Sequence, residues 1–381
     1  MDFDLNDDQR LLKESVDRLV ADTYDFESRK KRMAEPDGWS RANWAKLAEL
    51  GLLGLPFAEQ YGGFGGGPVE TMLLMEAFGR GLALEPYFAT VILGGGLVDR
   101  LGSDAQKQEI LTAVAAGNRL LAFAHVERSS RYNLADVTAT ARADGAGFTI
   151  DGEKSVVLHG DCADQLLVTA RTGGGRFDRN GIGLFLVDAN GTGVTRRGYP
   201  TQDGLRAAEI TLAGAKAVAV GDPGSALPMI EHVVDRAIAA LCAEAVGAME
   251  VMQEITLDYI KTRKQFGRAI GEFQVIQHRS VDMLVALEQA RSMALFATVM
   301  ADESDPMERA RAISAAKVQI GRSARHVGQE CIQLHGGIAM TNEYKAGHYF
   351  KRATMIDKLY GDADHHLTAL ARLGGLFGRA A

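Results

Sequence analysis

Apolar residues recur at helical spacing through the first part of the chain, from about residue 5 to residue 115. Asn6, followed three residues later by Gln9, has the pattern of a capping box and predicts the start of the first helix. The apolar stripe of this helix consists of Leu11, Leu12, Val16, Leu19 and Val20. A second predicted helix carries Trp44, Leu47 and Leu50 and ends at Gly51. A later helix buries Leu73, Leu74, Met75 and Phe78.

A glycine-rich run at residues 61–67, Tyr-Gly-Gly-Phe-Gly-Gly-Gly, lies between two of these predicted helices. Phosphate-binding loops are also rich in glycine, but they follow a β-strand and end in Gly-Lys-Ser/Thr. Neither feature is present in the pattern here, so we expect a turn between helices rather than a phosphate loop.

Near residue 120 the apolar pattern changes from helical to strand-like spacing. Residues 137–142 alternate, residues 144–147 read Asp-Gly-Ala-Gly, and the strand pattern resumes at residues 148–150, which predicts a β-hairpin. Further short strands are predicted at residues 121–126, 156–158, 166–168, 182–187 and 207–212, and Val218 closes the series. Short strands separated by turn residues predict an antiparallel β-barrel or β-sandwich.

From Ser225 onward the pattern is helical again. Residues 237–248 are rich in alanine and include Gly247, which predicts a helix that packs closely against its neighbours. Further helices are predicted at about 273–303 and 307–334, with Pro306 in the first helical position of the latter, and a last helix begins near Asp364. The order of patterns predicts three domains: helical over 1–117, β over 118–224 and helical over 225–381.

Composition and charge narrow the range of partners. The chain has 381 residues, 46% of them hydrophobic and 24% charged, which is typical of a soluble globular protein with more than one core. The net charge of −7, without any basic tail, makes nucleic acid an unfavoured partner. The pattern contains no apolar run long enough for a membrane span and no signal peptide. The three cysteines lie far apart and form no Cys-x-x-Cys pair, so we expect a reducing, cytoplasmic location.

The strongest candidate for chemistry is the stretch at residues 262–274, Thr-Arg-Lys-Gln-Phe-Gly-Arg-Ala-Ile-Gly-Glu-Phe-Gln. Arg263 stands at a helix end, where its planar guanidinium could bind a pyrophosphate through two parallel hydrogen bonds. Phe266 could cover a ring, and Gln274 could read an adenine or ribose edge. The same residues also fit a purely structural interpretation, in which basic residues stabilise a helix C-terminus and Gly267 ends the helix.

This stretch resembles the FAD-binding signature of the acyl-CoA dehydrogenase family. The resemblance continues at residues 333–338, Gln-Leu-His-Gly-Gly-Ile, and covers Tyr61-Gly62-Gly63 and residues 150–154, Ile-Asp-Gly-Glu-Lys. It implies an α+β multidomain fold with an N-terminal helical domain, a middle antiparallel β-barrel and a C-terminal four-helix bundle. It further implies FAD as cofactor, α,β-dehydrogenation of an acyl-CoA thioester and an electron-transfer flavoprotein or a similar acceptor.

The resemblance also implies which residues bind FAD. Arg263 would bind the pyrophosphate of a neighbouring subunit's FAD, so a dimer or tetramer is implied. The other implied contacts in the C-terminal domain are Phe266, Gln274, Gln333, Gly336 and Gly337. The middle domain departs from the family, because residues 126–132 read Val-Glu-Arg-Ser-Ser-Arg-Tyr and only Glu127 matches the usual loop. The usual Trp-x-Thr reads Val-Val-Leu at 156–158, so we expect the backbone at Val126 and Val157 to contact the flavin.

The catalytic base is the largest departure. The family's Tyr-Glu-Gly-Thr motif falls at residues 360–363, Tyr-Gly-Asp-Ala, so Gly361 stands where the base would be. Asp362, the next residue, is our candidate base, and we expect burial to raise its pKa. Asp235, Glu244 and a residue of a partner chain are alternatives. Asp362 could instead only cap the last helix or turn the loop.

Four further interpretations concern this region or the whole chain. Residues 361–366, Gly-Asp-Ala-Asp-His-His, resemble the small subunit of the pimeloyl-CoA dehydrogenases, which implies a two-gene enzyme and a hetero-tetramer with a related subunit. The aspartates and histidines of this run could suggest a metal, but Asp364 as the N-cap of the last helix explains them more simply, so no metal is expected. The chain could also be a catalytically silent flavin-binding partner subunit, or an oxidase that passes electrons to oxygen.

Overall fold

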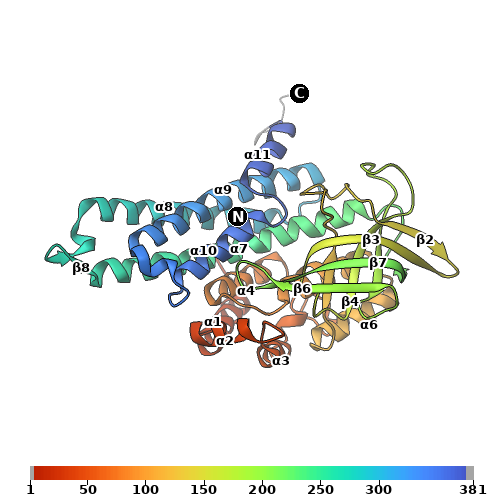
Figure 1. Ribbon diagram of the computed structural model, residues 1–381, viewed down its shortest axis with the longest axis horizontal. Coiled ribbons are helices and arrows are strands. Elements are labelled where there is room, and N and C mark those ends of the chain that lie inside the picture. Colours follow the sequence, from red (N-terminus) through yellow and green to blue (C-terminus); the bar gives the residue numbers. More distant parts are fainter. Residues whose placement is uncertain (1–3, 375–381) are drawn as a thin grey trace. The chain divides into compact units, whose positions relative to one another are not determined.

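The computed structural model describes residues 4–374, and its first third is helical (Figure 1). The helices there are α1 (Asp7–Thr23), α2 (Phe26–Ala34), α3 (Arg41–Glu49), α4 (Pro68–Gly81), α5 (Gly96–Leu101) and α6 (Asp104–Ala115). The 3₁₀ turns η1 (Leu52–Gly54) and η2 (Glu59–Tyr61) precede α4, and the buried π-helix η3 (Phe88–Gly95) precedes α5. The predicted capping box of Asn6 and Gln9 is present at the start of α1. The glycine-rich run follows η2 and leads into α4, as expected of a turn.

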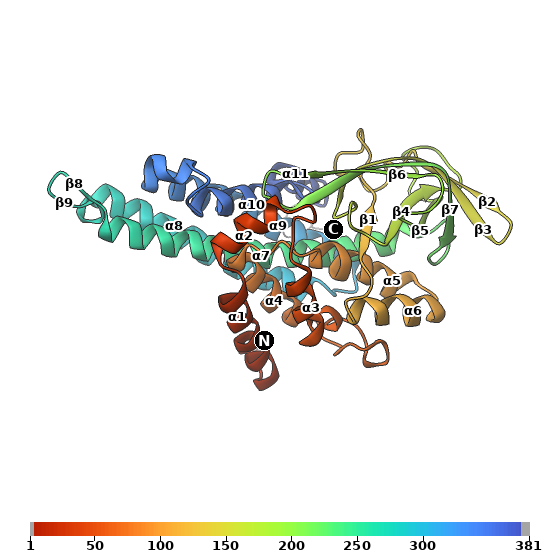
Figure 2. The ribbon, with the colours of Figure 1, turned by 60° about the horizontal axis from the view of Figure 1, so that its bottom comes forward.

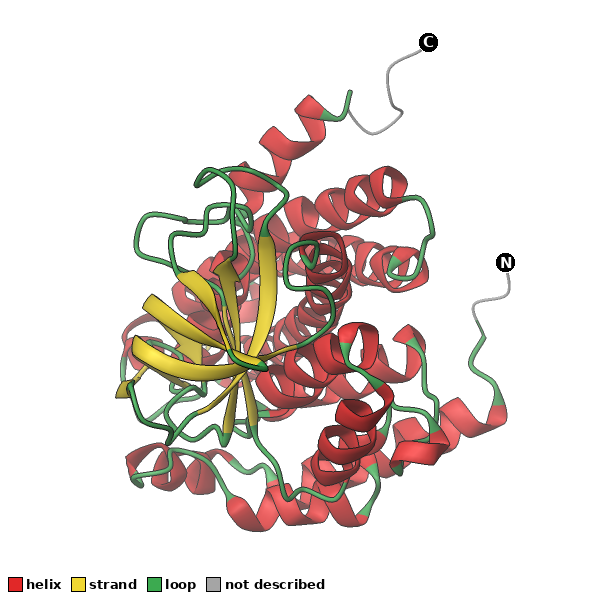
Figure 3. Cartoon of the chain, turned by 90° about the vertical axis from the view of Figure 1, so that its right-hand side faces the viewer, coloured by secondary structure: helices red, strands yellow, loops and turns green. Residues whose placement is uncertain are grey.

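Seven strands form a sheet that closes on itself, which confirms the predicted barrel (Figure 3). They are β1 (Leu121–Ala124), β2 (Thr140–Asp144), β3 (Gly147–Leu158), β4 (Gln165–Arg171), β5 (Ile182–Asp188), β6 (Val194–Pro200) and β7 (Arg206–Ala219). Pairing runs in the order β4, β2, β3, β7 and β5 and returns from β5 to β4, with β1 beside β4 and β6 beside β7. Most neighbours are antiparallel, but β1 and β2 run parallel to β4, which was not predicted.

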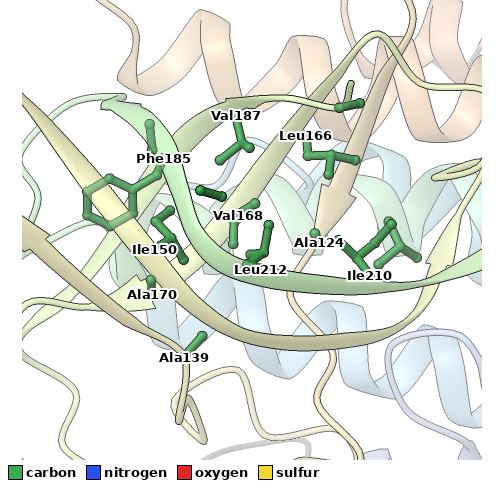
Figure 4. Close-up of a cluster of buried hydrophobic side chains, with 14 of the residues drawn as sticks. Ala124, Ala139, Ile150, Leu166, Val168, Ala170, Phe185, Val187, Ile210 and Leu212 are labelled. Carbon is green, nitrogen blue, oxygen red and sulfur yellow. The ribbon is translucent and has the colours of Figure 1, made fainter. Parts of the chain in front are cut away.

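The interior of the barrel is filled by aliphatic side chains and one aromatic ring (Figure 4). They come from alternate positions because successive side chains of a strand face opposite sides of the sheet. The members labelled in Figure 4 include Ile150, Leu166, Val168, Phe185, Val187, Ile210 and Leu212, which are at most 3% exposed. The predicted strand at 156–158 is the end of the longer strand β3, and β6 was not predicted because its residues are mostly exposed and carry no apolar alternation.

The remainder of the described chain is helical, apart from one short β-ribbon (Figure 2). The elements in order are α7 (Leu227–Thr262), β8 (Lys264–Gln265), β9 (Arg268–Ala269), η4 (Ile270–Glu272), α8 (Gln274–Met300), α9 (Pro306–His335), η5 (Gly336–Met340), α10 (Ala346–Lys358) and α11 (Ala363–Arg372). Pro306 occupies the first position of α9, as predicted, and Asp305 is its N-cap, with Oδ1 accepting from the Met307 N–H at 2.8 Å.

The small residues of α7 permit a close helix contact, as their composition predicted. Gly247 of α7 lies against Glu76 of α4, and a Cβ on Gly247 would come within 1.9 Å of the Glu76 carbonyl oxygen. The contact is reciprocal, since a Cβ on Gly79 of α4 would come within 2.0 Å of the Glu244 carbonyl oxygen of α7. The two backbones therefore touch at a pair of glycines.

Contacts between Cα atoms divide the described chain into two compact units. One comprises residues 4–30, 68–83 and 238–374 and contains the helical bundle. The other comprises residues 31–67 and 84–237 and contains the barrel. The N-terminal helices contribute to both units, and the three-domain division at residues 117 and 224 stays a prediction.

Helix α8 is long and apolar enough to cross a membrane, by length and composition alone. It is the one such helix among residues 4–374, and 33% of its most apolar window is buried. This is weak evidence for a span, because core helices of soluble proteins pass the same test. The absence of a membrane span therefore stays a prediction.

Candidate functional site

A β-hairpin formed by β8 and β9 joins the C-terminal end of α7 to the start of α8, and it closes in a tight two-residue turn (Figures 1 and 2). Gln265 pairs with Arg268, and the two residues between them, Phe266 and Gly267, have φ values of 53° and 84°. Positive φ at both central residues is typical of type I′ hairpin turns. The Phe266 side chain is 92% exposed, so the turn presents an aromatic ring to its surroundings.

Arg263 follows the last residue of α7, and its backbone forms the base of this hairpin. Its N–H donates to the Tyr259 carbonyl at 2.8 Å, and its carbonyl accepts from the Ile270 N–H at 2.9 Å. The side chain is exposed, and within residues 4–374 it forms no hydrogen bond or ion pair. Because the backbone is held and the guanidinium has no other partner, the guanidinium can donate two parallel hydrogen bonds to a phosphate group.

A second exposed turn begins where α9 ends. Gly336 has φ 67° and ψ −145°, a conformation that residues with a Cβ avoid. A Cβ built on Gly336 or on Gly337 would meet no atom within 4 Å. Gln333 is exposed on the last turn of α9, directly before these glycines. The backbone of this turn is therefore open to a ligand that approaches it closely.

The two turns lie at the same end of the bundle. The ring of His335 at the end of α9 packs on the ring of Tyr259 in α7, with centroids 4.5 Å apart. Arg279 of α8 pairs with Glu330 of α9, with 2.5 Å between Nε and Oε2. The structure thus gathers the residues that the sequence motifs singled out in this domain: Arg263, Phe266, Gln274, Gln333, Gly336 and Gly337.

The two candidates on the barrel differ in how they can contact a ligand. Val157 is 1% exposed and belongs to the barrel core, and its carbonyl accepts from the Gly160 N–H at 3.0 Å, so a ligand reaches neither its side chain nor its backbone unless the neighbouring bulge moves. Val126 is half-buried, and its carbonyl accepts from the Ser155 N–H at 2.8 Å. The register of β3 with β7 shifts between Lys154 and Val157, and Val156, which lies in this bulge, has φ 51°. This bulge turns the Val156 side chain outward, where it is 41% exposed.

Glu127, the one residue of its loop that matches the family, is a buried structural anchor. Its carboxylate accepts from the Lys154 Nζ at 2.8 Å and from the N–H groups of Thr138 and Ala139 at 2.9 and 3.0 Å. Burial alone would raise the pKa of Glu127, but the Lys154 ammonium and these hydrogen bonds lower it below its usual value. The loop is thereby attached to β3 next to Val126.

Asp362 caps α11, which corrects the prediction that Asp364 is the N-cap. One Asp362 carboxylate oxygen accepts from the His365 N–H at 3.0 Å, and the other lies 2.9 Å from the Lys358 Nζ. Burial acts to raise the pKa of Asp362, but the His365 N–H and Lys358 outweigh it, so the pKa lies below its usual value. The expected rise in this pKa is therefore wrong, because the sequence did not show that a cation and a helix end would stabilise the carboxylate.

Gly361 is packed so tightly that its position accepts no side chain without rearrangement. Its φ is 114°, and a Cβ there would lie 2.6 Å from His365 Cδ2 and 2.7 Å from His366 Nε2. His366 is buried, with Nε2 3.1 Å from the Tyr360 carbonyl oxygen and Nδ1 3.1 Å from Ser314 Oγ. The imidazole therefore fills the space beside the turn.

The alternative carboxylates on α7 differ from each other. Glu244 forms a buried two-point ion pair with Arg352, with distances of 2.5 and 2.7 Å, so it is a bonded structural carboxylate. Asp235 is half-buried on the same helix. No group of three histidine, cysteine or acidic residues within residues 4–374 is arranged to hold a metal ion.

Several residues around these sites were not singled out in the sequence. Lys317 is fully buried, and its Nζ donates to the carbonyls of Ile356 and Asp357 at 2.6 and 3.0 Å, which fixes the end of α10 before the Gly361 turn. His335 belongs to the second motif, but its position in the sequence indicated no role for its side chain. A buried lysine is indistinguishable in sequence from one on the exposed face of its helix, so no signal pointed to Lys317.

Comparisons with known proteins show which family the chain resembles over nearly its whole length. Three family models match: "Acyl-CoA dehydrogenase, N-terminal domain" at residues 6–118, the middle domain at 122–214 and the C-terminal domain at 229–374. The chain is 29% identical to the probable acyl-CoA dehydrogenase YngJ of Bacillus subtilis (strain 168), over 98% of this chain and 99% of that protein.

Two solved structures extend the similarity to three dimensions. The FAD complex of PigA aligns with a TM-score of 0.90 and 26% identity, over 99% of this chain and 100% of that chain. One chain of the ChsE4–ChsE5 complex from Mycobacterium tuberculosis aligns with a TM-score of 0.87 and 25% identity, over the full length of both chains. Motifs, fold and comparisons agree, and the chain belongs to the acyl-CoA dehydrogenase family of FAD-dependent enzymes.

Proposed function

We propose that this chain catalyses the α,β-dehydrogenation of an acyl-CoA thioester to the trans-2-enoyl-CoA. The observation that carries the proposal is the gathering of six residues from two distant motifs at one end of the bundle. When bound, FAD supplies the acceptor for the hydride that leaves the β-carbon.

The residues at this end of the bundle fit a flavin dinucleotide. Arg263 offers an unengaged guanidinium for the pyrophosphate, and the open glycine turn after α9 allows close backbone approach. Phe266 and Gln274 would contact the adenosine half. We propose that these residues serve the FAD of a neighbouring subunit, because the hairpin extends outward at the end of its helices (Figure 2).

On the barrel, we propose that backbone groups hold the flavin. The Val157 side chain is committed to the core, and the loop at Val126 is held by the buried Glu127–Lys154 pair. Backbone amides donate hydrogen bonds whatever the side chain, so this role does not depend on the family's hydroxyl groups at 156–158. The half-buried Val126 can take it directly, and Val157 only after the bulge at Val156 moves.

The α-proton of the substrate must be removed by a base, and Asp362 is the candidate from this chain. To act, its carboxylate would have to leave Lys358, because a carboxylate with a lowered pKa is a weak proton acceptor. Asp362→Asn should reduce the rate of flavin reduction by two or more orders of magnitude while FAD and ligand still bind. Asparagine is a good N-cap, so the helix start is kept.

Asp364→Asn is the matched control for this variant. Asp364 lies in the first turn of the same helix and is exposed, so we expect its replacement to leave flavin reduction within about twofold of the wild type. Near-normal reduction in Asp362→Asn would remove Asp362 as the base and direct attention to Asp235 or to a partner chain.

The turn at Gly361 and Asp362 favours a second function, that of a flavin-binding subunit that leaves proton abstraction to a related partner. Gly361 leaves no space for a side chain, and Asp362 is held by a helix end and a lysine. The ChsE4–ChsE5 structure, a complex of two differently named chains, is a precedent for such an assembly on this fold.

Purification of the chain alone separates these functions. A yellow protein that bleaches under anaerobic conditions with one member of an acyl-CoA panel supports the dehydrogenase. A yellow protein that is inert alone but active with the product of a neighbouring gene supports the partner subunit. Release of hydrogen peroxide at the turnover rate would instead identify an oxidase, and a colourless protein that does not take up FAD would contradict all three.

We further propose a cytoplasmic oligomer that passes its electrons to an electron-transfer flavoprotein or a similar acceptor. One structural relative, with a TM-score of 0.89 and 25% identity, is from a study of the electron transferring flavoprotein of Acidaminococcus fermentans. Reoxidation of the substrate-reduced protein by a purified electron-transfer flavoprotein, monitored through the return of flavin absorbance, tests this acceptor.

A further inference from the structure

His335 is the last residue of α9, directly before the turn that we propose to contact FAD. It is 3% exposed and stands between two aromatic rings, with its centroid 4.5 Å from that of Tyr259 and 5.0 Å from that of Tyr344. Nδ1 lies 2.8 Å from the Cys331 carbonyl oxygen, and Nε2 lies 3.1 Å from the Tyr344 hydroxyl. Every polar atom of the imidazole thus has a partner.

These contacts define the tautomer of His335. A carbonyl oxygen can only accept, so Nδ1 must carry the proton and donate it to Cys331. Nε2 is then the acceptor for the Tyr344 O–H. Burial lowers the pKa of His335 below its usual value, which keeps the ring in this neutral form.

The ring connects the two turns that carry the proposed FAD contacts. Tyr259, on which it packs, accepts the Arg263 N–H through its carbonyl at 2.8 Å. His335 itself directly precedes Gly336, and Tyr344 lies at the other end of the segment that these glycines begin. One imidazole therefore holds both ends of the second turn and the helix end from which the first turn starts.

We propose that His335 is a positioning residue for FAD: held between Tyr259 and Tyr344, it sets the Gly336–Gly337 turn at a fixed distance from Arg263. It does not contact the cofactor in this role. A glycine turn has no side chain to anchor it, and its two glycines are open on the Cβ side, so its position depends on the residues that flank it. This inference rests on the FAD site proposed above.

The test is an equilibrium titration of the full-length, flavin-depleted protein with FAD, followed by the loss of flavin fluorescence. His335→Phe keeps a ring for packing but removes both hydrogen bonds, and we expect the Kd for FAD to rise tenfold or more. Tyr344→Phe removes only the hydroxyl that binds Nε2, and we expect a rise of about threefold. Because this second change is small, it tests the proposal even where His335→Phe does not fold.

His366→Phe is the matched control, since His366 is also buried and bonded through both nitrogens. Its partner Ser314 lies 21 residues before His335 on α9, about 31 Å along the helix. We expect it to lower the melting temperature as His335→Phe does, but to leave the Kd for FAD within twofold of the wild type. A purely structural role for His335 would make the two variants alike in Kd as well.

Arg263→Ala distinguishes failure of this inference from failure of the proposed site. If Arg263→Ala weakens FAD binding while folded His335→Phe and Tyr344→Phe bind FAD as the wild type does, His335 is not a positioning residue. If Arg263→Ala leaves the Kd unchanged, the proposed FAD site is wrong, and with it the basis of the inference.

Discussion

At the scale of single residues, the backbone and the neighbours of Gly361 determine whether the turn before α11 can accommodate a side chain at this position. Its φ of 114° is unfavourable for residues with a Cβ, and the two imidazoles beside it occupy the space for one. Gly361→Ala should therefore lower the free energy of unfolding by about 2–4 kcal/mol, as expected when backbone strain and overpacking combine. Urea denaturation measures the change.

Gly145→Ala is the control for the backbone contribution alone. Gly145 also has a positive φ of 62°, but a Cβ there would meet nothing within 4 Å. We expect this variant to lose only about 1 kcal/mol. Equal losses in the two variants would show that the imidazoles move aside easily and that Gly361 could be replaced.

Two buried histidines should make the protein sensitive to acid. Burial lowers the pKa of His366 and of His125 to about 3, and the nearby charges of Lys317 and Lys154 act in the same direction. The unfolded chain binds these protons near pH 6.5, whereas the folded chain does not until about pH 3. The contribution of these two histidines to the free energy of unfolding is therefore fully present above pH 6.5. It is lost as the pH falls towards 3, by about 1.4 kcal/mol per pH unit for each histidine.

Unfolding free energies measured between pH 7 and pH 4.5 test this effect. His366→Gln should flatten the pH dependence by the equivalent of one proton, since glutamine does not titrate. A slope that is the same in wild type and variant would mean that His366 already takes up its proton within the folded state.

At the scale of elements, the loop that follows β1 depends on one buried ion pair with β3. Lys154→Met should destabilise the barrel by about 3–5 kcal/mol, because it leaves the Glu127 carboxylate buried without its cation. The double variant Glu127→Gln/Lys154→Met should lose less than Lys154→Met alone, since no uncompensated charge remains. Chemical denaturation of the four proteins of this double-mutant cycle gives the coupling energy, and additive losses would contradict the pairing.

Elements with a periodic apolar pattern or a capping signal were predictable from the sequence, and those that depend on distant partners were not. The capping box at Asn6, Pro306 at the start of α9 and the barrel strands follow from local patterns. The exposed strand β6 and the bulge at Val156 do not, because the former has few apolar residues and the latter depends on register with β7.

The candidate site divides in the same way. The motif residues at the two turns could be named from the sequence because their types and spacing carry the signal. Their common location, however, depends on the contact of His335 with Tyr259, which lies 76 positions earlier in the chain and in no motif. The lowered pKa of Asp362 depends likewise on Lys358, whose role only the fold of the turn reveals.

At the scale of the whole molecule, α8 carries an exposed apolar stripe that predicts self-association. Val281, Leu284 and Val285 are 45–56% exposed and lie on one side of this helix. Contiguous exposed apolar side chains are typical of interfaces. We expect the chain to elute as a dimer or a larger assembly at micromolar concentration, with light scattering giving the mass.

Val281→Glu/Leu284→Glu should shift the population towards the monomer, because it buries two charges in such an interface. Glu14→Lys, an exposed charge reversal on α1, places no charge in this stripe and should leave the mass unchanged. A wild-type protein that elutes as a monomer with flavin bound would remove the assignment of Arg263 to a neighbour's FAD.

The glycine pair between α4 and α7 has a consequence for the history of this sequence. What blocks a Cβ on Gly79 or Gly247 is in each case a backbone carbonyl of the facing helix, which no substitution can make smaller. A substitution at one glycine therefore cannot be compensated by a substitution at the other. Each position must stay glycine while the two helices keep this contact. In orthologues and in recombined libraries, both positions should therefore remain glycine wherever α4 and α7 keep this contact.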